Sequence, residues 1–155
     1  VFAIEALTQI PRARLAIIGA GEDRGMLQRR AQELGIADQV HFLGPLPHCD
    51  IARHVQAADI CVLPSSSEGI ANAWIESLAC GTPLVITDIG SAREVLTSPV
   101  AGRIVPRQAS AIAEACRDLL ANPPAREDVA AVVADYSWER NGRALVDYWR
   151  GLVTA

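Results

Sequence analysis

Several features that would point to common binding partners are scarce in this 155-residue sequence. The basic residues are scattered arginines without a basic run, and 18 acidic residues against 14 basic ones give a formal net charge of −4. Aromatic residues make up only 5% of the chain. A nucleic-acid-binding surface is typically a basic stripe with interleaved aromatic residues, so we expect no nucleic-acid partner.

Long apolar runs are also missing. The uninterrupted apolar segments are far shorter than the about 20 residues that a transmembrane helix needs, and no signal peptide is visible. We therefore expect no transmembrane segment.

Cysteine is present but not in a metal-binding pattern. Cys49, Cys61, Cys80 and Cys116 form no C-x-x-C pair and no Cys/His cluster of the zinc-binding kind. Cys61 lies in an apolar run and Cys116 in a helical pattern, so both are predicted as small core residues. We predict reduced thiols, no metal site and a reducing, cytoplasmic location.

What the sequence does contain is a regular alternation of apolar runs and helical patterns. Half of the residues are hydrophobic, which is enough for one domain with a substantial core. The pattern predicts strands at 14–19, 39–44, 60–64, 83–87 and 102–106. It predicts helices at 23–34, 48–57, about 70–80, around 93–96, 109–120, 126–134 and 138–152, and Gly35 and Gly81 are predicted to end the first and third of them. The strand at 102–106 is predicted near an edge of the sheet. This order indicates an α/β fold, a Rossmann-like parallel sheet with helices on both faces.

Ligands of open parallel sheets bind where the carboxyl ends of the strands meet the following helices. In this chain those loops are 19–23, 43–48, 64–72 and 88–93, and they are rich in Gly, Ser, Asn and acidic residues. The candidate site is therefore sought there.

The most informative of these loops begins with Glu68-Gly69 and leads into a helix. Gly69 would let backbone N–H groups approach a ligand closely. Asn72 is suited to cap the helix or to reach a ligand hydroxyl. If the helix starts near residue 70, Glu76 lies about two turns beyond Glu68 on a similar face. The helix dipole favours negative charge, such as a diphosphate, beside the helix start.

This run of Glu68, Gly69, Asn72 and Glu76 resembles the Glu-x7-Glu motif of the family 4 (group 1) retaining glycosyltransferases, which have the GT-B architecture. The resemblance covers almost the whole chain. Residues 15–22 resemble the family's strand and Gly-x-Gly turn, 40–44 its strand before the nucleobase loop, 81–90 its next block, and 136–138 the start of its final helix.

The resemblance implies binding of a nucleoside-diphosphate sugar, UDP- or GDP-linked, and a retaining transfer that needs no metal or other cofactor. Glu68 would be the catalytic residue beside the donor sugar, and Glu76 would bind the ribose hydroxyls. The residues implied to bind the donor are Gly21, Leu43, Gly44, Leu46, Gly69, Ile70, Ala71, Asn72 and Glu76.

The resemblance also implies that residues 1–155 are the donor-binding C-terminal domain, truncated on its N-terminal side. Residues 1–7 look like the middle of a helix without a cap, as expected for a chain that begins inside a larger protein. The acceptor-binding N-terminal domain, and the Arg and Lys that hold the diphosphate in the family, would lie outside this chain. We therefore expect the isolated domain to be inactive, and any attachment to the inner membrane to be made through the missing domain.

Three other functions compete with this interpretation. The nearest is one half of a GT-B-type sugar-nucleotide epimerase, which would bind the same class of ligand. A NAD-binding domain would need G-x-G-x-x-G and an acidic residue after the next strand, but 19–24 lacks the third glycine and 40–44 has no acid. A non-enzymatic receiver of flavodoxin-like topology would need an aspartate at a strand end, whereas Asp59 precedes its strand.

Some of these residues also have plain structural interpretations. Glu68 could be a solvated loop acid and Glu76 an exposed helix carboxylate. His48 is predicted to start a helix, and Arg93 to form a surface ion pair. The three tryptophans are predicted as packing residues: Trp74, and also Trp138 and Trp149, for which contact with the missing domain is the alternative.

Overall fold

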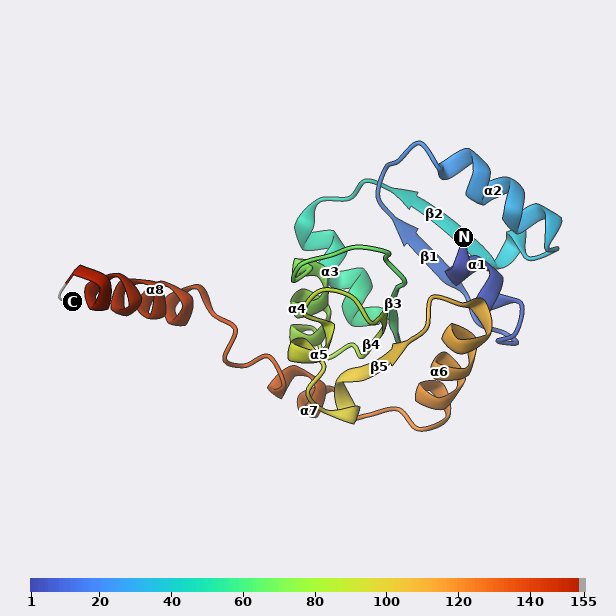
Figure 1. The fold of residues 1–155 in the computed structure, drawn as a ribbon. Coiled ribbons are helices and arrows are strands. Elements are labelled where there is room, and N and C mark those ends of the chain that lie inside the picture. The colour runs from blue at the N-terminus through green and yellow to red at the C-terminus, as the bar shows by residue number, and fades with distance from the viewer. Residues whose placement is uncertain (154–155) are drawn as a thin grey trace.

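The computed structural model describes residues 1–153, and in them strands alternate with helices (Figure 1). The strands are β1 (Leu15–Ile18), β2 (Val40–Gly44), β3 (Cys61–Leu63), β4 (Leu84–Thr87) and β5 (Gly102–Val105). The α-helices are α1 (Phe2–Leu7), α2 (Arg24–Glu33), α3 (His48–Ala57), α4 (Asn72–Ala79), α5 (Ala92–Val95), α6 (Ala109–Ala121), α7 (Arg126–Ala131) and α8 (Trp138–Val153). Short 3-10 helices, η1 (Ala37–Gln39) and η2 (Pro99–Ala101), complete the order. Each predicted strand and helix is confirmed, with ends shifted by a few residues.

Glycines stop two of the helices, as the sequence predicts. Gly35 follows α2 with φ +68°, and Gly81 follows α4 with φ +74°. In the first of these turns the backbone N–H of Ile36 donates to Ala31 O at 3.0 Å. A left-handed glycine of this kind satisfies the last carbonyls of a helix and turns the chain toward the next strand.

All strand pairs are parallel, which confirms the predicted α/β class. β1 pairs with β2, and β3, β4 and β5 pair in that order, so β5 lies at an edge as predicted. The hydrogen-bonded strands form two sheets rather than one, because β1 and β3 do not pair with each other. Consistent with this break, β3 is only half-buried and β1 is half-buried or exposed, whereas all four residues of β4 are buried.

Helix α1 joins the two sheets. Its residues Ile4 and Leu7 pack with the apolar side chains of β1, β2 and α2, while Ala6 packs with α6 and Val85 of β4. The carboxylate of Glu5 also accepts a hydrogen bond from Arg30 of α2 at 2.7 Å. The two halves of the fold therefore share one packed helix even though their strands do not pair.

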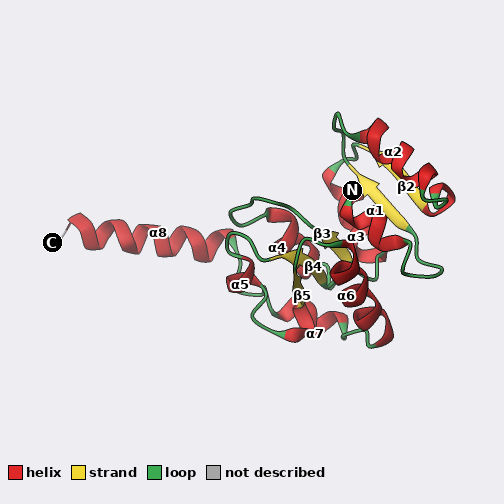
Figure 2. Cartoon of the chain, turned by 45° about the vertical axis from the view of Figure 1, so that its right-hand side comes forward, coloured by secondary structure: helices red, strands yellow, loops and turns green. Residues whose placement is uncertain are grey.

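Helix α8 projects away from the rest of the molecule (Figures 1 and 2) and buries none of its residues. Trp138 is 88% exposed and Trp149 60% exposed, so the prediction that they pack in this domain is wrong. Trp74 of α4 is fully buried among Leu78, Leu84 and their neighbours, which confirms its packing role.

Candidate functional site

The loops that follow β1 and β2 are tied together by their backbones. The Gly19 N–H donates to the carbonyl of Gly44 at 2.8 Å, and Gly19 adopts φ +127°. A side chain at Gly21 would meet no protein atom within 4 Å. The backbone conformation that favours glycine in this turn is therefore at Gly19. The space beside Gly21 is open to a ligand.

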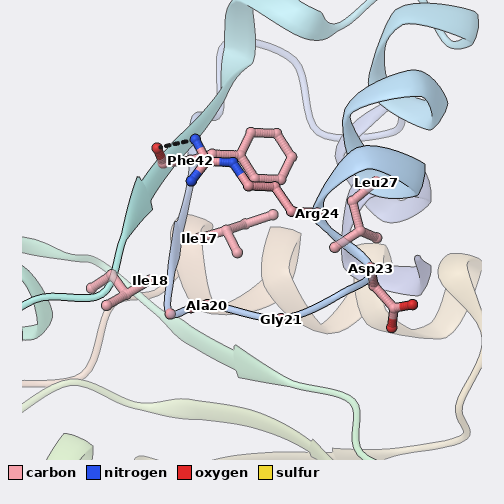
Figure 3. Close-up of a pocket in the computed structure, with 9 residues that line it drawn as sticks. Ile17, Ile18, Ala20, Gly21, Asp23, Arg24, Leu27 and Phe42 are labelled. Carbon is pink, nitrogen blue, oxygen red and sulfur yellow. Dashed lines mark hydrogen bonds between the residues drawn. The ribbon is translucent and has the colours of Figure 1, made fainter.

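A pocket of about 200 Å³ lies at this end of β1 and β2 (Figure 3). Arg24, in the first turn of α2, reaches across it toward Phe42 of β2. Its guanidinium donates to the Phe42 carbonyl at 3.4 Å and lies 5.8 Å from the centre of the ring. The residues lining the pocket are Ile17, Ile18, Gly19, Ala20, Gly21, Asp23, Arg24, Leu27 and Phe42.

The end of β2 and the loop after it carry two leucines, one on each side of Pro45. Leu43 is 38% exposed and Leu46 is half-buried, while Gly44 is buried with φ +73°. Pro47 is the N-cap of α3, and its carbonyl accepts from Ile51 N at 3.1 Å. We call residues 43–47 the base loop, because the resemblance implies that Leu43 to Leu46 flank the nucleobase.

Helix α4 begins two residues later than the motif predicts. Ala71 is its N-cap residue, and no side chain caps it, so the prediction that Asn72 caps the helix is wrong. The extended conformation of Ala71 (ψ 123°) keeps residues 68–71 outside the helix. Glu68 and Glu76 therefore do not share a helical face. At the helix start, the side chains of Ile70, which is 49% exposed, and Asn72 are open to solvent.

Glu76, one turn into α4, is paired with a residue that follows the base loop. Its Oε1 lies 3.2 Å from Nε2 of His48, the first residue of α3. His48 begins its helix as predicted, but the contact with Glu76, 28 residues away, was not predicted. The structure thus brings Glu76 to the same place as the base loop.

Glu68 and Gly69 lie against the turn that follows β4. Gly90 there has φ +49°, and a Cβ at Gly90 would overlap the carbonyl oxygens of both Glu68 and Gly69. The N–H of Ser91 donates to Gly69 O at 3.2 Å. The side chain of Glu68 is exposed and forms no hydrogen bond or ion pair with the part of the chain that the structure describes. The turn therefore fixes the backbone of Glu68 and leaves its carboxylate open to a ligand.

Arg93 is engaged by an acid of the same turn. Its Nε and Nη2 donate to the two carboxylate oxygens of Asp88 at 2.9 and 2.6 Å, which confirms the predicted surface ion pair. The hydrogen bond from Arg93 holds the pKa of Asp88 below its usual value, and Asp88 raises the pKa of Arg93. Because its charge is already paired in this bidentate way, Arg93 is poorly placed to hold a phosphate.

The cysteines are free, and two of them lie in elements next to the helix that carries Glu76: Cys61 in β3 and Cys80 at the C-cap of α4. Burial raises the pKa of Cys61, and burial followed by the charge of Glu76 raises that of Cys80. Neither thiol is therefore activated as a nucleophile.

Within residues 1–153, no group of three or more His, Cys, Asp or Glu side chains is placed to hold a metal ion. None of the helices in that range is long and apolar enough to cross a membrane.

The fold matches known glycosyltransferase structures. Sucrose-phosphate synthase from Thermosynechococcus elongatus superposes with a TM-score of 0.86 at 29% identity, over 99% of this chain and 42% of that one. The Anabaena protein HepE, solved in complex with UDP, superposes with a TM-score of 0.76 at 22% identity, over 90% of this chain and 40% of that one. The chain thus has the fold of one half of a GT-B glycosyltransferase.

The sequence comparison is more specific. Residues 1–132 match the family described as glycosyl transferases group 1, and the chain belongs to that family. It is 34% identical to a D-inositol 3-phosphate glycosyltransferase of Corynebacterium urealyticum, over 97% of this chain and 38% of the relative. The chain thus spans less than half the length of these relatives. Family membership decides against the NAD-binding and receiver alternatives and favours a transferase over an epimerase.

Proposed function

We propose that this chain is the donor-binding part of a retaining glycosyltransferase that uses a nucleoside-diphosphate sugar and no metal ion. The single observation that carries the proposal is the meeting of Glu76 with the base loop through His48. A carboxylate accepts hydrogen bonds from paired hydroxyls, and an apolar loop can flank a flat base. Together they suit a nucleoside better than an isolated sugar or phosphate.

We place the sugar of the donor beside Glu68. The carboxylate of Glu68 is exposed, and the turn that contains Gly90 holds the backbone of Glu68 in place. A negative charge held there would stabilise the positive charge that develops on the sugar ring as the bond to the diphosphate breaks. Residues 69–72 would offer backbone and side-chain groups to the sugar and the diphosphate at the start of α4.

We favour a uridine nucleotide. The Anabaena protein HepE is solved in complex with UDP, and 40% of it superposes on this chain with a TM-score of 0.76. The acidic net charge and the pairing of Arg93 with Asp88 leave few cations at the site for a diphosphate. The cations that hold it would accordingly come from residues outside this chain.

We also propose that the acceptor-binding domain belongs to the same protein and contacts α8. The chain covers 38% of the D-inositol 3-phosphate glycosyltransferase of Corynebacterium urealyticum, which leaves room for a second domain. The exposed apolar side chains of α8, including Tyr148 and Trp149, form an apolar surface of the kind that a partner usually covers. Without that domain, the chain binds the donor weakly and transfers no sugar.

A cytoplasmic location fits this proposal. All four cysteines are unpaired, as expected of a protein kept in a reducing compartment. Any association with the inner membrane would be made through the acceptor-binding domain.

The test is an NMR titration of the chain with UDP, GDP, ADP and NAD, following backbone amide shifts. We expect UDP to shift residues of the base loop and residues 68–76, with a dissociation constant near the millimolar range. Glu76→Ala should weaken UDP at least about tenfold, because it removes a charged hydrogen-bond acceptor for the ribose. Glu68→Gln should leave UDP binding unchanged and weaken only a UDP-sugar.

Two results would contradict the proposal. One is binding of UDP without shifts in these loops, and the other is equal binding by wild type and Glu76→Ala. A preference of the chain for NAD over UDP would instead support the NAD-binding alternative.

A further inference from the structure

His48 offers the only side chain that engages the Glu76 carboxylate among the residues that the structure describes. The two side chains are 78% and 48% exposed, and Nε2 of His48 lies 3.2 Å from Oε1 of Glu76. His48 stands one residue after the base loop, so the contact joins the two parts of the site that would hold the base and the ribose.

We propose that His48 is a positioning residue for nucleotide binding: its Nε2–H donates to Glu76 Oε1 and orients the carboxylate to receive the 2′ and 3′ hydroxyls of the ribose. This inference rests on the proposed function and adds a residue to it. His48 itself is not placed against the nucleotide.

The geometry of the carboxylate allows both partners at once. An ionised carboxylate has two oxygens and about four lone-pair positions for hydrogen bonds. The imidazole takes one position on Oε1, which leaves Oε2 and a second position on Oε1 for two hydroxyl donors. A half-exposed glutamate without such a partner would sample several rotamers and lose that freedom on binding. Holding the carboxylate beforehand therefore strengthens binding.

The two helices that carry this pair are held in register by contacts further along. Thr82, just beyond α4, donates from Oγ1 to the carbonyl of Val55 in α3 at 2.7 Å. Cys80 Sγ lies 4.0 Å from Ala52 O, again joining the end of α4 to α3. At the other end, Pro47 fixes the start of α3. The side chains of His48 and Glu76 therefore meet across two helices that are also joined by hydrogen bonds further along.

The experiment compares UDP binding by wild type, His48→Ala, His48→Gln and, as a matched control, His54→Ala. His54 lies on the same helix and is exposed, but its ring nitrogen Nδ1 contacts the Asp50 carbonyl at 2.8 Å rather than Glu76. We expect His48→Ala to weaken UDP about fivefold, the effect of one hydrogen bond. His48→Gln, which keeps an N–H donor of similar reach, should restore most of the affinity, and His54→Ala should bind as wild type does.

A second ligand tests the contribution of the ribose hydroxyls alone. With 2′,3′-dideoxy-UDP, which lacks both hydroxyls, wild type and His48→Ala should bind equally weakly. A merely structural effect of the substitution would weaken both ligands by the same factor. Long-range ¹H–¹⁵N spectra of the free protein should show His48 carrying a proton on Nε2, as the hydrogen bond requires.

The outcomes separate the two proposals. If Glu76→Ala loses UDP but His48→Ala does not, or if His48 carries its proton on Nδ1 alone, the role of His48 is overturned and the nucleotide site stands. If UDP shifts no residue of the site in wild type, the proposed function fails and the inference falls with it.

Discussion

At the scale of single residues, burial decides which thiols are inert. Cys116 of α6 is 4% exposed and packs among Ile112, Leu119 and Val85. Desolvation raises the pKa of this thiol from 9.0 to about 11. Cys49, by contrast, is exposed near the start of α3.

Cys116 should make the fold less stable in alkaline solution. Between pH 9 and 11 the unfolded chain ionises this thiol while the folded chain keeps it protonated, so the free energy of unfolding falls as pH rises through that range. Below pH 9 the contribution is fully present. Urea unfolding at pH 8, 9, 10 and 11 should show this decline in wild type and a flatter profile in Cys116→Ala. A wild-type stability that does not change from pH 9 to 11 would show that the thiol is not desolvated.

At the scale of elements, the turn after β4 supports the loop that precedes α4. The hydroxyl of Thr87 donates to Ser65 O at 2.6 Å, and Ser91 N donates to Gly69 O. Gly90 lies directly against the Glu68–Gly69 backbone. These contacts connect two loops that are far apart in sequence, so their register depends on the packing of β3 beside β4.

Gly90→Ala should lower stability and displace Glu68. The alanine would hold φ +49° at a cost of about 1–3 kcal/mol, and its Cβ would overlap backbone oxygens, which cannot rotate away as a flexible side chain can. Urea unfolding measures the loss, and amide shifts at 68–70 report the displacement. Gly142→Ala is the control, because a Cβ there meets nothing within 4 Å and the residue lies within α8. Equal stability of wild type and Gly90→Ala would show that the turn is not packed as described.

At the scale of the whole molecule, the chain has one packed body and one helix that packs on nothing within residues 1–153. The exposed apolar side chains of α8 include Leu145, Tyr148, Trp149 and Leu152. A helix with one strongly apolar face normally buries that face against a partner. No element within residues 1–153 covers that face, which agrees with the proposed second domain.

Removal of residues 136–155 should leave the body intact. Since α8 buries no residue, we expect the melting temperature to change by less than about 2 °C, where a loss of 1 kcal/mol would shift it by about 2–4 °C. Sedimentation should also show less self-association, because an exposed apolar surface is removed. Val129→Ala is the positive control: Val129 of α7 is fully buried, and its truncation should lower the melting temperature by several degrees. A large drop for the shortened chain would place α8 against the body.

Local signals were sufficient for the elements and for the family. Alternating apolar runs and helical patterns predicted every strand, and glycines 35 and 81 predicted two helix ends, because these features depend on neighbouring residues. Local signals were insufficient at the start of α4. The chain stays extended through Ala71, so Asn72 does not cap the helix and the two glutamates do not share one face.

The sequence by itself determined the α/β class, the membership in the glycosyltransferase group 1 family and the motif that contains Glu68 and Glu76. Only the tertiary structure decided what stands beside each glutamate: His48 beside Glu76, and the Gly90 turn beneath Glu68. These partners are 28 and 22 residues away along the chain, so no local pattern encodes them. Gly90 meets Glu68 because the parallel strands β3 and β4 bring the loops at their carboxyl ends to the same edge of their sheet. His48 meets Glu76 because α3 and α4 lie side by side and are joined by the hydrogen bond from Thr82 to Val55.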